Sequence, residues 1–154
     1  MPASDIMDSQ PTVLQSTDSI ELAVQHIMEN RYRNLPVVDT KGCYLGVFGV
    51  NQLLKMMMPT ALVMEHGLTN APFVHGTVGE MSKKYAAIKT SPIVDHLETQ
   101  EPVYADTPTL EALLMLYQSR SSVPVLDRET GCLLGVISYW DVGERVLGWH
   151  REPS

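Results

Sequence analysis

The sequence predicts a mixed α/β (α+β) fold made of two copies of one strand–helix–strand–strand–helix unit. Three blocks recur in the same order. Residues 19–24 (SIELAV) match residues 109–114 (TLEALL), residues 34–39 (NLPVVD) match 122–127 (SVPVLD), and residues 42–47 (GCYLGV) match 131–136 (GCLLGV). The starting positions differ by 90, 88 and 89 residues, so the spacing hardly drifts. Internal similarity at a fixed period is typical of a fold built from repeated units.

Each copy begins with a short extended segment, residues 11–15 (PTVLQ) or 101–105 (EPVYA), which leads into a helix. In the first copy, Asp18 and Glu21 have the spacing of a capping box. In the second copy, Thr107 is a possible cap and Pro108 suits the first helical position. The apolar residues predicted to face the core at helical spacing are Ile20, Ala23, Val24 and Ile27 in the first helix and Leu110, Leu113, Leu114 and Tyr117 in the second.

Two strands and a second helix complete each copy. The β-rich runs at residues 35–39 and 123–127 end at turns over residues 39–42 and 127–131. Second strands follow at 44–48 and 133–137, and second helices are expected to begin near Val50 and Tyr139. A unit of roughly 50 residues buries too little apolar surface to be stable alone. We therefore expect two sheets packed face to face by pseudo-two-fold symmetry, with the helices outside.

The predicted organisation is a first repeat at residues 1–58, an insert at 59–93, a second repeat at 94–148 and a C-terminal tail at 149–154. The insert is expected to be partly helical, over residues 77–90 (TVGEMSKKYAAIKT). Residues 66–76 (HGLTNAPFVHG) are typical of a loop. The sequence does not indicate a role for the insert.

Composition and charge exclude several classes of protein. The net charge of −7 makes nucleic acid an improbable partner, because phosphate-backbone binding requires a basic surface. The first ten residues lack the basic start and apolar core of a signal peptide. The longest apolar stretch, residues 53–64, is interrupted by Lys55 and Pro59 and is too short to cross a bilayer. We expect a cytoplasmic protein without a membrane partner.

No catalytic or metal-binding pattern is present. The sequence contains no nucleophile elbow, P-loop or pair of catalytic acids, and its histidines lack metal-ligand spacing, so neither an enzyme nor a metal site is expected. The two cysteines, Cys43 and Cys132, occupy equivalent places in the two copies and form no C-x-x-C motif. They are interpreted as small residues packed near strands, with a disulfide or redox pair as the alternative.

The order of elements, with a P-V block followed by an L-G-V block in each copy, resembles the CBS domain. The tandem arrangement resembles a CBS pair, also called a Bateman module, as a stand-alone protein. The resemblance covers residues 11–57 and 94–147. It implies a non-catalytic regulatory module that senses an adenosine-containing ligand (AMP, ADP, ATP or S-adenosylmethionine) between the repeats. It also implies a homodimer that forms a flat disc of four repeats. With no attached effector domain expected, the signal would pass to a separate effector protein.

The second copy carries the family's ligand motif G-h-h-[ST]-x-x-D at residues 135–141 (GVISYWD). The resemblance assigns Asp141 to the ribose hydroxyls, which a carboxylate binds through strong charge-assisted hydrogen bonds. It assigns Ser138, at a helix N-terminus that favours anions, to ribose or phosphate. Trp140 is a rim or interface residue. The first copy has Gly49 and Gln52 at these positions, so one competent nucleotide site is expected per chain, with the other site weak or empty.

The resemblance implies that each site also uses residues of the other repeat. For the Asp141 site, Thr12 is expected to contact the adenine edge, Tyr32 to stack on the base, and Arg33 or Asn34 to lie near ribose or phosphate. The ligand-binding set is Thr12, Val13, Tyr32, Arg33, Asn34, Leu35, Pro36, Ser138, Trp140 and Asp141. The equivalents at the weaker site are Pro102, Ser121 and Ser122.

Other interpretations remain open. Ser138 and Asp141 could serve only to cap the helix near Tyr139. The chain could be a ligand-free dimerisation or protein-interaction module whose cleft is filled by side chains. Its contact surface would then contain Trp140, Trp149 and the methionines at 56–58. Weak binding of single-stranded nucleic acid is a more distant alternative, disfavoured by the acidic charge.

Overall fold

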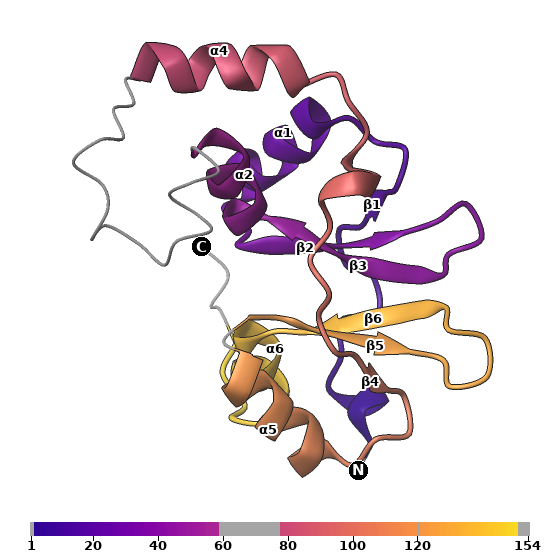
Figure 1. Cartoon of the computed structure of the whole chain (residues 1–154). Coiled ribbons are helices and arrows are strands. Elements are labelled where there is room, and N and C mark those ends of the chain that lie inside the picture. The colour runs from indigo at the N-terminus through magenta and orange to yellow at the C-terminus, as the bar shows by residue number, and fades with distance from the viewer. Residues whose placement is uncertain (1, 59–77, 120, 151–154) are drawn as a thin grey trace.

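The computed structural model describes residues 2–58, 78–119 and 121–150. It has two layered repeats, each with a three-stranded sheet (Figure 1). The first repeat consists of β1 (Leu14–Gln15), α1 (Ile20–Asn30), β2 (Asn34–Val38), β3 (Tyr44–Gly49) and α2 (Val50–Met57). The second consists of β4 (Val103–Tyr104), α5 (Thr109–Ser119), β5 (Val123–Leu126), β6 (Leu133–Ile137) and α6 (Tyr139–Arg145). Helix α4 (Val78–Ile88) and the 3₁₀ turns η1 (Ala3–Asp5) and η3 (Ile93–His96) lie outside this repeated order.

The two sheets have the same topology, with strand orders β1-β2-β3 and β4-β5-β6. In each sheet the first strand is parallel to the middle strand, and the middle strand is antiparallel to the last. Figure 1 shows the sheets adjacent at the centre of the molecule and the helices on the outside. The predicted fold class and element order are therefore confirmed, and α2 and α6 begin at the residues the sequence indicated.

Each repeat has its own hydrophobic core. In the first, Leu14, Val37 and Phe48 of the sheet pack against the inner face of α1. The predicted face of α1 is confirmed, since Ile20, Ala23 and Ile27 are buried there and Val24 is partly buried. In the second, the buried residues are Ala3, Ile6, Val103, Ala112, Leu116, Val123, Val125 and Ile137. Burial of the valine, leucine, isoleucine and phenylalanine side chains in these cores supplies about 1.5–3 kcal/mol each.

The predicted inner face of α5 is wrong. Leu110, Leu114 and Tyr117 are exposed, at 81%, 52% and 76%, while Ala112 and Leu116 meet the sheet. Leu113 is partly buried against the core. Apolar residues lie on all sides of this helix, so helical periodicity alone did not distinguish the core face from the solvent face.

The predicted caps also differ in detail. Ser19, rather than Asp18, caps α1 and accepts a hydrogen bond from Leu22 N–H at 3.1 Å. The Asp18 carboxylate instead accepts from Gln15 N–H at 2.8 Å. In the second repeat, the Thr107 hydroxyl accepts from Tyr104 N–H at 2.9 Å. Helix α5 begins one residue later than expected, at Thr109.

Both chain segments that precede a repeat cross to the other repeat. We call residues 2–8 and 92–98 the crossing segments. Asp8 forms an antiparallel bridge with Val136 in β6, and Glu98 forms one with Val47 in β3. Ala3 and Ile6 are buried in the second core, and Ile93 in the first. Residues 2–8, which lie within the predicted first repeat in the sequence, therefore pack against the second repeat in space.

The predicted insert helix is confirmed as α4, which packs against α2. Its Tyr85 and Ile88 side chains pack against the first core. The predicted loop at 66–76 lies outside the described residues. Within the described ranges, no helix has the length and apolar character required to span a bilayer.

Candidate functional site

The molecule contains two pseudo-equivalent positions where a strand runs into the second helix of a repeat. We call them the Asp141 cleft, at the start of α6, and the Gln52 cleft, at the start of α2. In each, the side chain of the third helical residue accepts a hydrogen bond from the backbone N–H of the N-cap residue. These residues are Gln52 and Gly49 in the first repeat, and Asp141 and Ser138 in the second. The clefts share this backbone arrangement and differ in their side-chain chemistry.

In the Asp141 cleft, the carboxylate is almost fully engaged. Asp141 is 8% exposed. Its Oδ2 accepts from the Ser138 N–H at 2.7 Å and from the Ser138 hydroxyl at 2.9 Å. Its Oδ1 accepts from Arg145 Nη1 at 3.2 Å. This is the capping geometry of the alternative interpretation, and Ser138 and Asp141 lie together as predicted.

Two opposing effects act on the Asp141 charge. Burial raises the pKa of the carboxyl group above its ordinary value, and the nearby Asp8 carboxylate adds to this. The hydrogen bonds from Ser138 and the Arg145 guanidinium act in the opposite direction. Arg145 also donates to the Ile6 carbonyl at 3.0 Å, so the crossing segment helps to hold the cation beside the acid.

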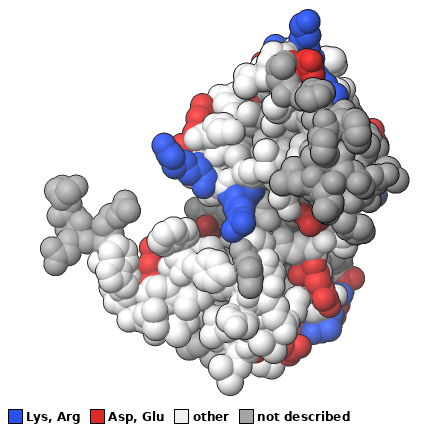
Figure 2. Space-filling model, turned by 60° about the vertical axis from the view of Figure 1, so that its left-hand side comes forward, with Lys and Arg blue, Asp and Glu red and all other residues white. Residues whose placement is uncertain are grey.

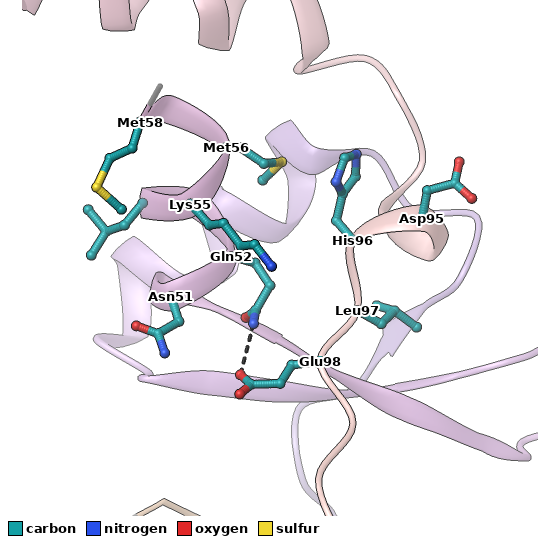
Figure 3. Close-up of a pocket in the computed structure, with 10 residues that line it drawn as sticks. Asn51, Gln52, Lys55, Met56, Met58, Asp95, His96, Leu97 and Glu98 are labelled. Carbon is teal, nitrogen blue, oxygen red and sulfur yellow. Dashed lines mark hydrogen bonds between the residues drawn. The ribbon is translucent and has the colours of Figure 1, made fainter. Parts of the chain in front are cut away.

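In the Gln52 cleft, Gln52 binds the N-cap backbone, and the acidic group comes from a second residue, Glu98. Gln52 Oε1 accepts from Gly49 N–H at 2.8 Å, which reproduces the backbone bond made by Asp141. Gln52 Nε2 donates to Glu98 Oε2 at 2.8 Å (Figure 3). The acid absent from position 52 is therefore supplied by the crossing segment. Sequence reasoning missed Glu98.

A sequence signal for this residue did exist. Residues 2–8 (PASDIMD) and 92–98 (PIVDHLE) share a proline, an aspartate and a terminal acid at an offset of 90 residues. Extending the repeat comparison before the first strand would have paired Glu98 with Asp8. Both crossing segments thus bring an acidic residue toward a cleft.

A cavity of about 320 Å³ opens at the Gln52 cleft. It is lined by both repeats, through Arg33, Asn34, Asn51, Gln52, Glu98, Thr99, Gln100, Ser119 and Ser121. A second cavity of about 780 Å³ adjoins it along α2 and η3 and shares Asn51, Gln52 and Glu98 (Figure 3). Volumes of this order suit small-molecule ligands.

The cavity wall is itself hydrogen-bonded. Gln100 Nε2 donates to the Ser122 carbonyl at 2.5 Å, and the Ser121 hydroxyl donates to Gln100 Oε1 at 3.3 Å. The predicted weaker-site residues Ser121 and Ser122 are thus at the Gln52 cleft, while Pro102 lies just before β4. Among the described residues, no group of three or more His, Cys, Asp or Glu side chains is arranged to hold a metal ion.

The structure does not bring the remaining predicted ligand-binding residues together at one position. Thr12 Oγ1 and the Tyr32 hydroxyl are 3.1 Å apart, so the predicted adenine contacts are adjacent. Arg33 and Asn34 line the cavity with Gln52 rather than with Asp141. Val13 is partly buried, Leu35 and Pro36 are buried in β2, and Trp140 is 82% exposed. The hydrogen bonds of the described residues join Thr12 to Tyr32 and Ser138 to Asp141, but do not connect these pairs.

Two β-α-β-β-α units related by pseudo-two-fold symmetry, with matching N-cap arrangements at the starts of their second helices, define the tandem CBS class of fold. The chain belongs to the CBS domain family, whose model matches residues 3–59 and 78–148. No curated protein matches the chain at a significant level.

Solved structures share this fold at low sequence identity. A CBS domain-containing protein of unknown function from Kribbella flavida has a TM-score of 0.66 at 20% identity, covering 96% of this chain and 99% of that one. CBSX2, an Arabidopsis thaliana protein solved in complex with AMP, has a TM-score of 0.67 at 20% identity, covering 96% of each chain. A CBS domain pair/ACT domain protein from Thermotoga maritima has a TM-score of 0.66 at 15% identity, covering 96% and 98%.

Proposed function

We propose that the chain is a non-catalytic regulatory module that senses an adenosine-containing ligand between its two repeats. The observation that carries this proposal is the Ser138–Asp141 pair, which holds a carboxylate at the start of α6. The cavity at the pseudo-equivalent Gln52 cleft, which both repeats line, supports a ligand position between the repeats. A ligand bound between two bodies changes their relative tilt when it binds one arrangement more tightly than another. The AMP bound to the similarly folded CBSX2 supports an adenine nucleotide as the ligand class.

We assign the ribose to Asp141 and the stronger site to its cleft. Asp141 Oδ1 accepts one hydrogen bond in the described structure, from Arg145, and a carboxylate oxygen has room for a second. A ribose hydroxyl donating to it forms a charge-assisted bond, which is about twice as strong as a neutral one. The start of α6 beside Ser138 then favours the phosphate. Thr12 and Tyr32 supply the adenine contacts.

The Gln52 cleft is the weaker candidate. The Gln52 amide offers neutral hydrogen bonds worth about 0.5–1.5 kcal/mol each, and both of its ends are already bonded, to Gly49 and Glu98. The Glu98 carboxylate opposes a phosphate in the same cavity, although Arg33 partly compensates. We expect this cleft to stay empty at ligand concentrations that fill the other.

Calorimetric titration of the protein with AMP, ADP, ATP and S-adenosylmethionine tests the proposal. We expect one strong site for at least one of them. Asp141→Asn should weaken it by about 1.5–3 kcal/mol, roughly 10- to 150-fold, by removing the charged acceptor. Gln52→Ala is the matched control and should leave the affinity within about threefold.

The two variants also separate the possible failures. Absence of heat with all four compounds, on folded wild-type protein, contradicts ligand sensing. Loss of binding in Gln52→Ala but not in Asp141→Asn moves the ligand to the other cleft and refutes the assignment of Asp141. Thermal unfolding of each variant verifies that a loss of affinity is not a loss of fold.

A second function is favoured by the engaged side chains. Both Asp141 oxygens have partners, and hydrogen bonds cross the Gln52 cleft, as expected of a ligand-free dimerisation or protein-interaction module. A stable oligomer without any nucleotide-induced thermal shift would support this function.

In either case we infer a homodimer that acts in the cytoplasm and signals through a separate effector protein. Exposed apolar residues on α5 and from the start of α6 into the tail support a protein contact there: Leu110, Leu114, Tyr117, Tyr139, Trp140, Val146, Leu147 and Trp149. We name this set the α5–α6 face. The lower left of the surface shown in Figure 2 is largely free of Lys, Arg, Asp and Glu.

A further inference from the structure

The two cysteines of the sequence face each other across the boundary between the repeats. Cys43 and Cys132 form an isolated antiparallel bridge, which joins the start of β3 to the start of β6. They are separated by 89 positions in the chain. Both thiols are free and partly exposed. The bridge links the two sheets directly at the hairpin ends of the repeats.

The backbone pairing places the two side chains close together. Tyr44 N–H donates to the Gly131 carbonyl at 3.2 Å, and Leu133 N–H donates to the Gly42 carbonyl at 3.0 Å. These bonds flank the cysteines, which therefore form a non-hydrogen-bonded pair, the kind with the shorter Cα separation of about 4.5 Å. A disulfide requires a Cα separation of about 4.4–6.8 Å. The usual separation of a non-hydrogen-bonded pair falls within this range, so the pairing favours a disulfide.

The turns before the cysteines hold them in this register. Asp39 Oδ1 accepts from Cys43 N–H at 2.9 Å, and Thr130 Oγ1 accepts from Cys132 N–H at 3.2 Å. Gly42 and Gly131 have φ values of +83° and +73°, which favour glycine. The cysteines thus follow two turns whose side chains hydrogen-bond to the cysteine backbone.

We propose that Cys43 and Cys132 are a reversible redox-modification site that closes a disulfide between the two repeats. The oxidant is a low-molecular-weight disulfide such as glutathione disulfide. One cysteine thiolate attacks it, forms a mixed disulfide and releases one glutathione thiolate. The second cysteine thiolate attacks the mixed disulfide and releases the other. The protein loses two electrons and two protons, and the oxidant becomes two thiols.

The surroundings of the two cysteines affect both how fast the disulfide forms and how easily it is reduced. Desolvation, Asp39 and the Cys132 thiol raise the pKa of Cys43, although Lys41 acts in the other direction. Because the thiolate is the reactive form, the raised pKa slows attack by the Cys43 sulfur on the oxidant. Both cysteine residues are partly exposed, which leaves the product open to reducing thiols.

The disulfide fixes one end of the interface between the repeats. Cys43 directly precedes β3, and the Gln52 cleft lies beyond the other end of that strand, roughly 20 Å away at 3.3 Å per residue. A covalent bond here would limit tilting of one repeat against the other without entering a cleft. The cross-link itself does not depend on any ligand, so it stands or fails separately from nucleotide sensing.

Treatment of the purified full chain with glutathione disulfide tests the site. We expect alkylation and intact-mass analysis to change from two free thiols to none, with no attached glutathione at the end point. The closed loop of about 90 residues should raise the unfolding midpoint by about 10 °C, and dithiothreitol should reverse this. Cys132→Ser is the matched control and should show no rise.

Other products would overturn the proposal. They are stable glutathione adducts on both cysteines, covalent dimers on a non-reducing gel, or two unreacted thiols in native protein whose unfolded form reacts under the same conditions. A disulfide within the chain that leaves the unfolding midpoint unchanged would also contradict it. Since the sequence holds just these two cysteines, an intramolecular disulfide has one possible pairing.

Discussion

The residue at the N-cap of the second helix differs between the repeats for a steric reason. A Cβ atom at Gly49 would overlap the Arg33 carbonyl oxygen and lie 2.5 Å from Asn34 Cβ and 2.7 Å from Asn34 Cα. The equivalent Ser138 has a side chain that accepts from Asp141 N–H at 3.3 Å. The first cleft therefore lacks a hydroxyl because β2 passes too close to hold one.

This packing predicts that the serine cannot be restored. Gly49→Ser should lower the free energy of unfolding by about 1–3 kcal/mol, since the added atoms force β2 away from the start of α2. It should not increase nucleotide binding at the Gln52 cleft. Urea denaturation measures the first effect and calorimetry the second.

The reverse exchange provides the control. Ser138→Gly adds no clash, but it removes the hydroxyl that donates to the buried Asp141 carboxylate, so its cost of about 1.5–3 kcal/mol comes from a lost hydrogen bond rather than from overlap. If Gly49→Ser were as stable as the wild type, the steric explanation would be wrong.

At the residue scale, the sequence predicted contacts within one motif. It did not predict contacts between residues that are far apart in the sequence. Ser138 and Asp141 are three residues apart, and their contact follows from the start of a helix. The bond between Gln52 and Glu98 joins residues 46 positions apart in different repeats. Its prediction required knowing that residues 92–98 cross onto β3, which depends on how the repeats pack.

At the scale of elements, the crossing segments explain the glycine of the L-G-V block. A Cβ at Gly135 would overlap the Asp8 carbonyl oxygen and lie 2.8 Å from Met7 Sδ. A Cβ at Gly46 would lie 2.7 Å from the Glu98 carbonyl oxygen. Each crossing segment thus lies directly on the last strand of the opposite sheet, and any side chain at these positions would displace it.

The crossing segment 2–8 should therefore stabilise the second repeat rather than the first. Ile6 is 1% exposed within the second core. We expect Ile6→Ala to lower the free energy of unfolding by about 2–4 kcal/mol, through lost burial and the cavity left behind. Urea denaturation followed by far-UV circular dichroism reports it, because unfolding of the second repeat removes α5 and the β4–β6 sheet.

Ser9→Ala, just after the segment and exposed, is the control and should change stability by less than about 0.5 kcal/mol. A small effect of Ile6→Ala, similar to that of the control, would mean that the segment does not contribute to the core.

The order of elements followed from the sequence, whereas the orientation of α5 did not. Alternating runs and turn residues define strands and hairpins locally, so the β-α-β-β-α order and the starts of α2 and α6 were predictable. For α5, the choice between the face with Leu116 and the face with Leu110 depends on the sheet beneath it. Both faces are apolar, and only packing separates them.

At the scale of the whole molecule, the two repeats differ in how their helices are covered. In the first repeat, α4 packs against α2, and Tyr85 and Ile88 pack against the core. In the second, the α5–α6 face remains exposed among the described residues, including Leu110 at 81% and Trp140 at 82%. Large apolar residues gathered on one surface are typical of a protein–protein contact.

This asymmetry predicts a homodimer through the α5–α6 face. Wild-type protein should have twice the chain mass by light scattering after size-exclusion chromatography. Leu110→Glu should raise the dimer dissociation constant by about 30-fold, equivalent to about 2 kcal/mol, because it places a charge in a desolvated contact. Val78→Glu on α4 is a close control, since Val78 is 78% exposed but lies on the other repeat's covering helix, and it should leave the mass unchanged. A monomeric wild type would contradict the dimer, and equal weakening by both variants would place the contact elsewhere.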